Sequence, residues 1–218
     1  MKMINSPVVI RHRDKKITKE VCGPRDRIIK LGGYPYTLHL FQAIFPQDPK
    51  LISYMTRKVI GHKKFNAKFD YVFALAQKSI SFATVISQKT KKPLLVAYSR
   101  RYDKPNKEMR DTEIQIIEPK KYSDPFILYS YFLHKGDRVT VVSDDMNWGD
   151  ASISVARAFL KRGIKIANYV IGVEKYDRKG VQRLISFLKR ASQTRVPIHF
   201  CTSVIIREGR MLPIDLSK

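Results

Sequence analysis

Apolar runs alternate with amphipathic stretches along most of this chain. Near-continuous apolar segments lie at 69–76 (FDYVFALA), 93–98 (PLLVAY), 139–142 (VTVV) and 164–173 (IKIANYVIGV). Segments with helical spacing stand before, between and after them, at 48–60, 80–88, 152–162 and 178–191. Short runs that are apolar at nearly every position are typical of parallel strands covered on both faces. The alternation therefore predicts an α/β fold with a doubly wound, mainly parallel sheet and helices on both faces.

The ends of these segments agree with that layout. Asp48 and Pro49 are placed to cap and begin the first helix, and Gly163 stands at the C-cap of the helix at 152–162. Two further apolar runs, 197–201 and 204–206, predict terminal strands.

The chain shows no internal repeat and no low-complexity linker, so we predict one domain. Residues 1–47 form an N-terminal hood segment and residues 48–218 the α/β core. The polar and charged stretch 99–124 predicts a long flexible loop with a short hairpin near Glu113–Ile117.

Charge says most about partners. The chain has 42 Lys and Arg against 19 Asp and Glu, a net charge of +23. Such an excess favours polyanions, and cations with aromatic residues between them suit RNA, where rings stack on bases. We expect a nucleic-acid partner, with RNA or the ribosome favoured over DNA, although a uniformly solvated basic surface is the alternative. The expected contacts are Arg11, Arg13, Lys15, Lys16, Arg57, Lys58, Lys63, Lys64, Lys68, Lys91 and Lys92.

Several classes of protein and site are not supported by the sequence. No apolar run reaches the ~18 residues of a membrane span, and the N-terminus lacks the apolar region of a signal peptide. We therefore expect a cytoplasmic protein with no membrane partner. Cys22 and Cys201 lie far apart without a CxxC partner, and the five histidines show no metal-ligand spacing, so neither a disulfide nor a structural metal is expected.

The stretch VTVVSDDMNWGDAS at 139–152 is a buried strand that runs into an acidic turn and then a helix. Ligands of open parallel sheets bind beyond the carboxyl ends of the strands, so this turn is expected at the mouth of any site. Asp144 and Asp145 are suited either to holding Mg²⁺ or to capping the following helix or pairing with nearby Lys and Arg. Trp148 is suited either to stacking on a base or to packing against the hood.

Four segments resemble the type I phosphoribosyltransferases, specifically those similar to orotate phosphoribosyltransferase. Ile29–Tyr36 resembles the family's N-terminal F-x-L-x-S-G-x-x-S-P-Y-Y stretch, and Val72–Ala83 its strand, pyrophosphate loop and helix, V-x-G-x-x-x-G-G-I-x-x-A. Arg100–Lys104 resembles the R-K-x-x-K that opens the flexible catalytic loop. Val139–Ser152 stands where the phosphoribosyl pyrophosphate motif V-V-V-x-[DE]-D-x-x-T-T-G-G-[ST] belongs.

The resemblance implies the family's fold, a homodimer and a Mg²⁺-assisted displacement of pyrophosphate from ribose C1 by a base nitrogen. In an active enzyme it implies catalytic roles for Arg101 and Lys104. It implies ligand contacts from Lys78, Ser79, Arg100, Asp144, Asp145, Asn147, Trp148, Gly149 and Ser152.

The phosphate-binding parts of the motif depart from the family. One alignment places Ser143 and Asp144 on the acid pair, with Asn147 and Trp148 on the two threonines; another keeps Asp144 and Asp145 as the pair. In the first, Asp150 replaces a glycine and would stand near a phosphate, a repulsion on the order of several kcal/mol at an effective dielectric of ~20. The pyrophosphate loop departs as well, since Ala74, Lys78 and Ser79 replace glycines.

Charge and motif together lead to a first hypothesis and two alternatives. The first is a catalytically degenerate phosphoribosyltransferase-fold protein that binds RNA or a ribonucleoprotein such as the ribosome, with a nucleotide-like ligand in the old cleft. One alternative is an active Mg²⁺-dependent transferase of the orotate or purine type, in nucleotide synthesis or salvage. The other is a metabolite-sensing regulator, which the absence of a helix-turn-helix segment disfavours.

Overall fold

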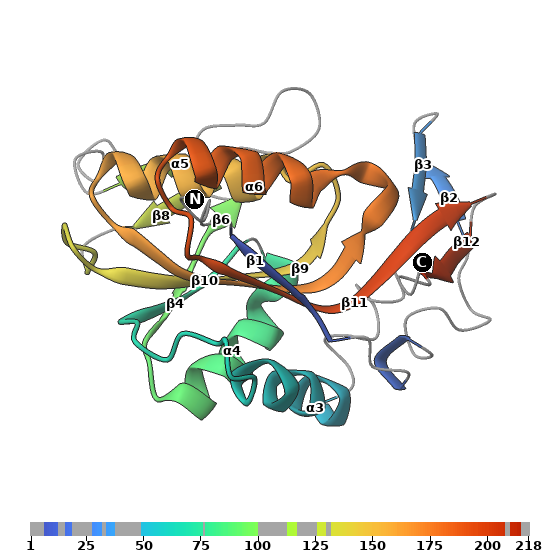
Figure 1. Ribbon diagram of the computed structural model, residues 1–218, viewed down its shortest axis with the longest axis horizontal. Coiled ribbons are helices and arrows are strands. Elements are labelled where there is room, and N and C mark those ends of the chain that lie inside the picture. The colour runs from blue at the N-terminus through green and yellow to red at the C-terminus, as the bar shows by residue number, and fades with distance from the viewer. Residues whose placement is uncertain are drawn as a thin grey trace, which may run out of the picture.

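The computed structural model describes residues 7–12, 16–18, 28–31, 34–37, 49–75, 77–99, 113–116, 126–129, 132–207 and 210–214. Its centre is a seven-stranded sheet with helices on both faces (Figure 1). The strands follow the order β1 (Val8–Arg11), β11 (Pro197–Arg207), β10 (Lys165–Lys175), β9 (Arg138–Met146), β4 (Tyr71–Ala74) and β5 (Leu94–Val96). Every neighbouring pair on this path is parallel, and β12 (Arg210–Pro213) adds to β11 in the antiparallel sense. The predicted doubly wound, mainly parallel fold is confirmed.

Helices cover both faces of the sheet. α3 (Pro49–Ile60) and α4 (Ile80–Thr90) lie on one face, and α5 (Asp150–Lys161) and α6 (Gly180–Arg190) on the other (Figure 1). None of the helices within the described residues is long and apolar enough to cross a membrane.

Successive strand residues serve opposite faces. Phe73 and Val141 join the core cluster on the α5–α6 side, whereas Val72 and Val142 join the cluster on the α3–α4 side. Because side chains alternate across a strand, a sheet covered on both faces needs apolar residues at nearly every position. This requirement is the physical reason that the strands are continuous apolar runs in the sequence.

Two smaller sheets stand apart from the main one. β2 (Ile28–Leu31) and β3 (Tyr34–Thr37) form an antiparallel pair inside the segment predicted as the hood. β6 (Tyr98–Ser99), β8 (Phe126–Tyr129) and β7 (Glu113–Ile116) form a three-stranded antiparallel sheet. The hairpin predicted near Glu113–Ile117 is thus a single strand, β7, whose partner β8 follows later in the chain. The division into hood and core remains a prediction.

The predicted helices occur within a few residues of their expected bounds, and the differences concern the strands. β11 is one continuous strand where two were predicted, and β9 extends through the acidic pair to Met146. β1 was not predicted at all. Cys201 is buried in β11, whereas Cys22 and Asp48 lie outside the described residues.

Candidate active site

The order of the strands reverses between β4 and β9. β4 leads through α4 to β5 on one side, whereas β9 leads through α5 to β10 and then to β11 on the other. The carboxyl end of β4 lies beside β9, because Leu75 N donates to Val142 O at 2.8 Å, and β9 continues past this point to Met146. Open α/β sheets bind their ligands at such a switch point, so the site is expected where these two strands end.

The turn after β4 offers one cation to this crevice. A short 3-10 turn, η1 (Gln77–Ser79), joins β4 to α4, and the buried Ser79 Oγ donates to Leu75 O at 2.8 Å across it. Ser79 therefore closes the turn. Lys78 is exposed, and its ammonium lies close enough to the end of β9 to lower the pKa of Asp144.

Two aspartates near the carboxyl end of β9 lie in different surroundings. Asp144 is buried, and its burial, followed by the neighbouring charge of Asp145, raises its pKa to about 7. Asp145 is partly exposed, and its carboxylate contacts Lys175 Nζ of β10 at 2.8 Å. Ser143 Oγ donates to Asp145 O at 2.9 Å, which fixes the backbone at this point. The pair therefore combines a carboxyl group that titrates near neutral pH with one that faces an ammonium.

The helix that follows the acidic pair, α5, begins after the turn at 147–149. Gly149 is the N-cap of α5 with φ of 76°, and Ile153 N donates to Gly149 O at 2.9 Å. The N–H groups of Asp150, Ala151 and Ser152 precede that bond and have no acceptor within the helix. Backbone donors and the positive end of the helix dipole make such a terminus suited to a phosphate.

Asp150 is paired with a residue of α6. Its carboxylate contacts Arg183 Nη2, and Arg183 Nη1 donates to Trp148 O at 2.7 Å. The arginine therefore spans the turn and offsets the carboxylate charge at the start of α5. The repulsion of phosphate expected from Asp150 alone is reduced accordingly.

The turn at 147–149 is packed against the start of α6. A Cβ on Gly180 would stand 2.2 Å from Asn147 O, and a Cβ on Gly149 would stand 2.6 Å from Gly180 O. Asn147 Oδ1 is buried and finds no hydrogen-bond partner among the described residues. The Trp148 ring is 44% exposed and lies 5.2 Å from the Arg178 guanidinium.

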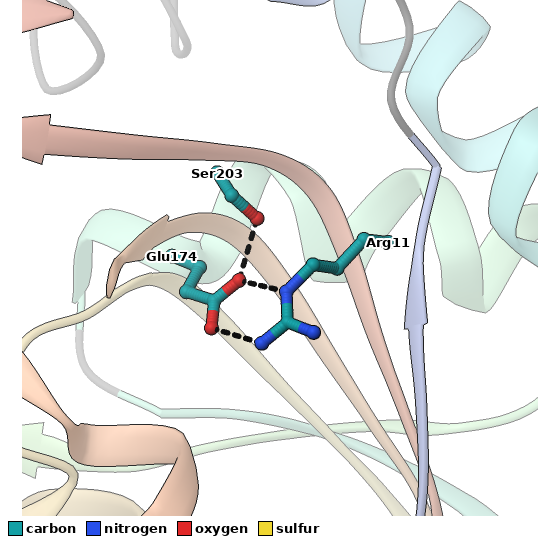
Figure 2. A network of polar contacts seen from close by, with 3 residues as sticks. All are labelled: Arg11, Glu174 and Ser203. Carbon is teal, nitrogen blue, oxygen red and sulfur yellow. Dashed lines mark hydrogen bonds and ion pairs between the residues drawn. The ribbon is translucent and has the colours of Figure 1, made fainter. Parts of the chain in front are cut away.

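The remaining predicted residues divide into three groups. Arg100, Arg101, Lys104, Arg13 and Lys15 lie outside the described residues. Arg11 forms a two-point ion pair with the buried Glu174, with Nε–Oε2 at 2.5 Å and Nη2–Oε1 at 2.6 Å, and Ser203 Oγ donates to the same carboxylate (Figure 2). The cations with exposed side chains are Lys16, Arg57, Lys58, Lys63, Lys64, Lys68 and Lys91, whereas Lys92 is half-buried.

Sequence reasoning did not find Lys175 and Arg183, which pair with Asp145 and Asp150. Each belongs to a later element, β10 or α6, and no local pattern marks either residue as a site residue.

The acidic pair fits a divalent cation of the kind the resemblance implies. No group of three or more His, Cys, Asp or Glu side chains in the described part of the chain could hold a metal ion by itself. Mg²⁺ is usually held by one or two carboxylates together with substrate phosphates and waters. Asp144 and Asp145 supply that number of carboxylates at the end of β9.

Comparison with known proteins gives consistent relatives, although no protein-family model matches the chain. It is 30% identical over 158 residues to the hypoxanthine/guanine phosphoribosyltransferase of Methanohalophilus mahii. The matched residues make up 72% of this chain and 77% of that protein. The Methanococcus voltae protein of the same name is 30% identical over 154 residues, covering 70% and 77%.

Solved structures with the same fold include adenine phosphoribosyltransferases. That of Leishmania donovani has a TM-score of 0.69 at 10% identity, covering 93% of this chain and 86% of its own. That of Trypanosoma brucei, in complex with AMP, pyrophosphate and ribose-5-phosphate, has a TM-score of 0.66 at 14% identity, covering 87% and 78%.

Proposed function

The chain belongs to the type I phosphoribosyltransferase family, and from this premise we propose that it is an active, Mg²⁺-dependent transferase of the purine type. The relatives named above are purine enzymes, which favours hypoxanthine or guanine over orotate as the base. Relatives of this kind also favour an active enzyme over a degenerate protein that binds only RNA.

The observation that carries the proposal is the surroundings of Asp144. This carboxyl group is buried at the switch point of the sheet beside Asp145, opposite the cation of Lys78 and just before the N-terminus of α5. Buried carboxyl groups with strongly raised pKa values are costly to keep in a fold and cluster at functional sites. A purely structural turn would need neither the burial nor the second acid.

Each part of the crevice suits one part of phosphoribosyl pyrophosphate. The first-turn N–H groups of α5 suit the 5′-phosphate, and Asp144 and Asp145 suit the ribose hydroxyls. Lys78 would stabilise the charge that develops on the leaving pyrophosphate. Mg²⁺ held at the two aspartates would neutralise further charge on the same leaving group. Arg183 limits the repulsion between Asp150 and the phosphate.

The proposal is tested by nucleotide formation from phosphoribosyl pyrophosphate, Mg²⁺ and hypoxanthine or guanine. We expect turnover with at least one of these bases, and a loss of at least about 100-fold in kcat/KM for Asp144→Asn, the scale of a preorganised charged group. The matched control is Asp137→Asn, because Asp137 stands just before β9, at the opposite end of that strand.

The proposal is wrong if no purine base is turned over and calorimetry detects no binding of phosphoribosyl pyrophosphate. A degenerate site then accounts better for the replaced hydroxyls at Asn147 and Trp148. If Asp137→Asn lowers kcat/KM as much as Asp144→Asn does, the acidic pair is not the centre of the reaction.

A further inference from the structure

A pocket of about 480 Å³ opens on the α3–α4 side of the sheet. Its lining consists of Lys16, Pro49, Lys50, Ser53, Tyr54, Arg57 and Lys89. Lys89 lies in the last turn of α4, whereas Ser79 at the crevice is the N-cap of the same helix. At about 1.5 Å of rise per residue, roughly 15 Å of helix separates this pocket from the switch point. The pocket is therefore not part of the proposed active site.

The polypeptide around this pocket is strongly basic. From 49 to 99 the chain holds ten lysines and arginines and one acidic residue, Asp70. Asp70 is already engaged, because its carboxylate accepts a hydrogen bond from Arg138 N at 2.8 Å. Neither α3 nor α4 contains an acid. Positive charge concentrated in this way attracts polyanions and speeds their association.

Aromatic rings lie among these cations. Lys16 Nζ stands 5.1 Å and Lys58 Nζ 5.3 Å from the centre of the Tyr54 ring. Farther along the same face, Lys92 Nζ stands 6.0 Å from the Phe69 ring. On α3, Lys50, Tyr54 and Arg57 occupy positions i, i+4 and i+7, so they form one line along the helix.

We propose that this surface, the α3–α4 basic face formed by Lys16, Lys50, Tyr54, Arg57, Lys58 and Lys89, binds single-stranded nucleic acid. The charges come from two helices and a preceding segment, so they suit a chain of phosphates better than one small anion. Binding surfaces for single strands combine a cationic groove with rings on which bases stack, and Tyr54 supplies such a ring. Lys63, Lys64 and Lys68, which follow α3 in the chain, have exposed side chains as well.

The test is fluorescence anisotropy of the full chain with a labelled single-stranded RNA of about 16 nucleotides, over a range of salt concentrations. Arg57→Gln with Lys89→Gln removes two exposed cations from the last turns of α3 and α4. The matched control, Lys161→Gln with Lys189→Gln, removes two exposed cations from the last turns of α5 and α6 on the opposite face.

Each phosphate contact on a single strand contributes about 0.7 to the slope of log K against log salt. Loss of two contacts should therefore lower the slope by about 1.4 and weaken binding about 25-fold at 0.1 M salt, with little difference left near 1 M. Tyr54→Leu should weaken binding about fivefold or more at an unchanged slope, because stacking releases no counterions. The control should stay within about threefold of the wild type, since it removes the same charge from a surface that makes no contact.

Three results would overturn the proposal: equal weakening in both double variants, an affinity without salt dependence, or no detectable binding at low salt. Displacement of the RNA by phosphoribosyl pyrophosphate would place the strand in the active-site crevice and would also overturn it. Purine transferase turnover is measured on the same variants and should not change. RNA binding and transferase turnover are thus measured independently, so the failure of one proposal can be told from the failure of the other.

Discussion

Acid should weaken this fold through one buried histidine. His199 of β11 is fully buried, and its Nδ1 lies 3.3 Å from His12 Nε2. Its Nε2 is buried without a hydrogen-bond partner among the described residues. The rings of His62 and Phe65 also pack near His199, with centroids 5.6 and 5.8 Å from the centroid of its ring. A proton on His199 would be buried beside two further histidines.

The size of the effect follows from the pKa. Burial, and then the charges of His12 and His62, lower the pKa of His199 to about 3 from its usual 6.5. The unfolded chain takes up the proton first, so this stability is present above pH 6.5 and is lost as the pH falls toward 3. Proton linkage gives a loss of about 0.8 kcal/mol between pH 7.5 and 6, and of about 2 kcal/mol between pH 7.5 and 5.

The measurement is the difference between wild type and His199→Phe in urea unfolding at pH 7.5, 6 and 5. The wild type must be compared with the variant because Asp144 changes stability with pH in the opposite direction. Its pKa of about 7 lies above its usual 3.8, so its contribution to the free energy of unfolding is lost as the pH rises. The phenyl ring keeps contacts with Phe65 and cannot titrate. The wild type should lose about 2 kcal/mol relative to the variant between pH 7.5 and 5.

His134→Gln is the control, because the His134 side chain is 77% exposed, and this variant should follow the wild type. A wild-type curve parallel to that of His199→Phe, within about 0.5 kcal/mol, would refute the reasoning, since a buried neutral histidine must produce the difference. If His199→Phe fails to fold, His199→Leu gives the same comparison with a smaller apolar side chain.

Three further perturbations test other parts of the structure. Asp144→Asn should resist urea better than the wild type at pH 8 and lose that advantage toward pH 5, because the raised pKa makes ionisation of the buried carboxyl group costly to the fold; equal stability at pH 8 would contradict this. Arg11→Met should lower the free energy of unfolding by about 3 kcal/mol, because the carboxylate of Glu174 stays buried without its cation, and adding Glu174→Gln should recover part of the loss in the same urea assay. Gly180→Ala should lower purine transferase turnover at least tenfold, because its Cβ would stand 2.2 Å from Asn147 O and displace the turn before α5; unchanged turnover would show that this turn does not hold substrate.

The main sheet could be predicted because strands that are buried on both faces are apolar at nearly every position, and such runs are visible in the sequence. Where that signal is interrupted, prediction failed for a long-range reason. Thr202 and Ser203 look like a break between two strands, but both are buried inside β11, where Ser203 Oγ donates to Glu174. β1 ends in Arg11, whose charge is matched by the same Glu174, 163 residues away in sequence. Neither match can be seen in a local window.

The active site shows the same limit in its charges. The sequence placed Asp144 and Asp145 correctly at the end of a buried strand, because that requires only the strand and its direction. It also presented Asp150 as an uncompensated charge at the phosphate position, and much of the hypothesis of a degenerate site followed from that. In the structure Arg183, 33 residues later, pairs with Asp150 and donates to Trp148 O. A comparison of motifs residue by residue leaves out the groups that later elements bring to each position, and here α6 brings Arg183. The charge at the start of α5 is therefore that of an ion pair beside a helix N-terminus, a setting that admits an anion as a lone carboxylate would not.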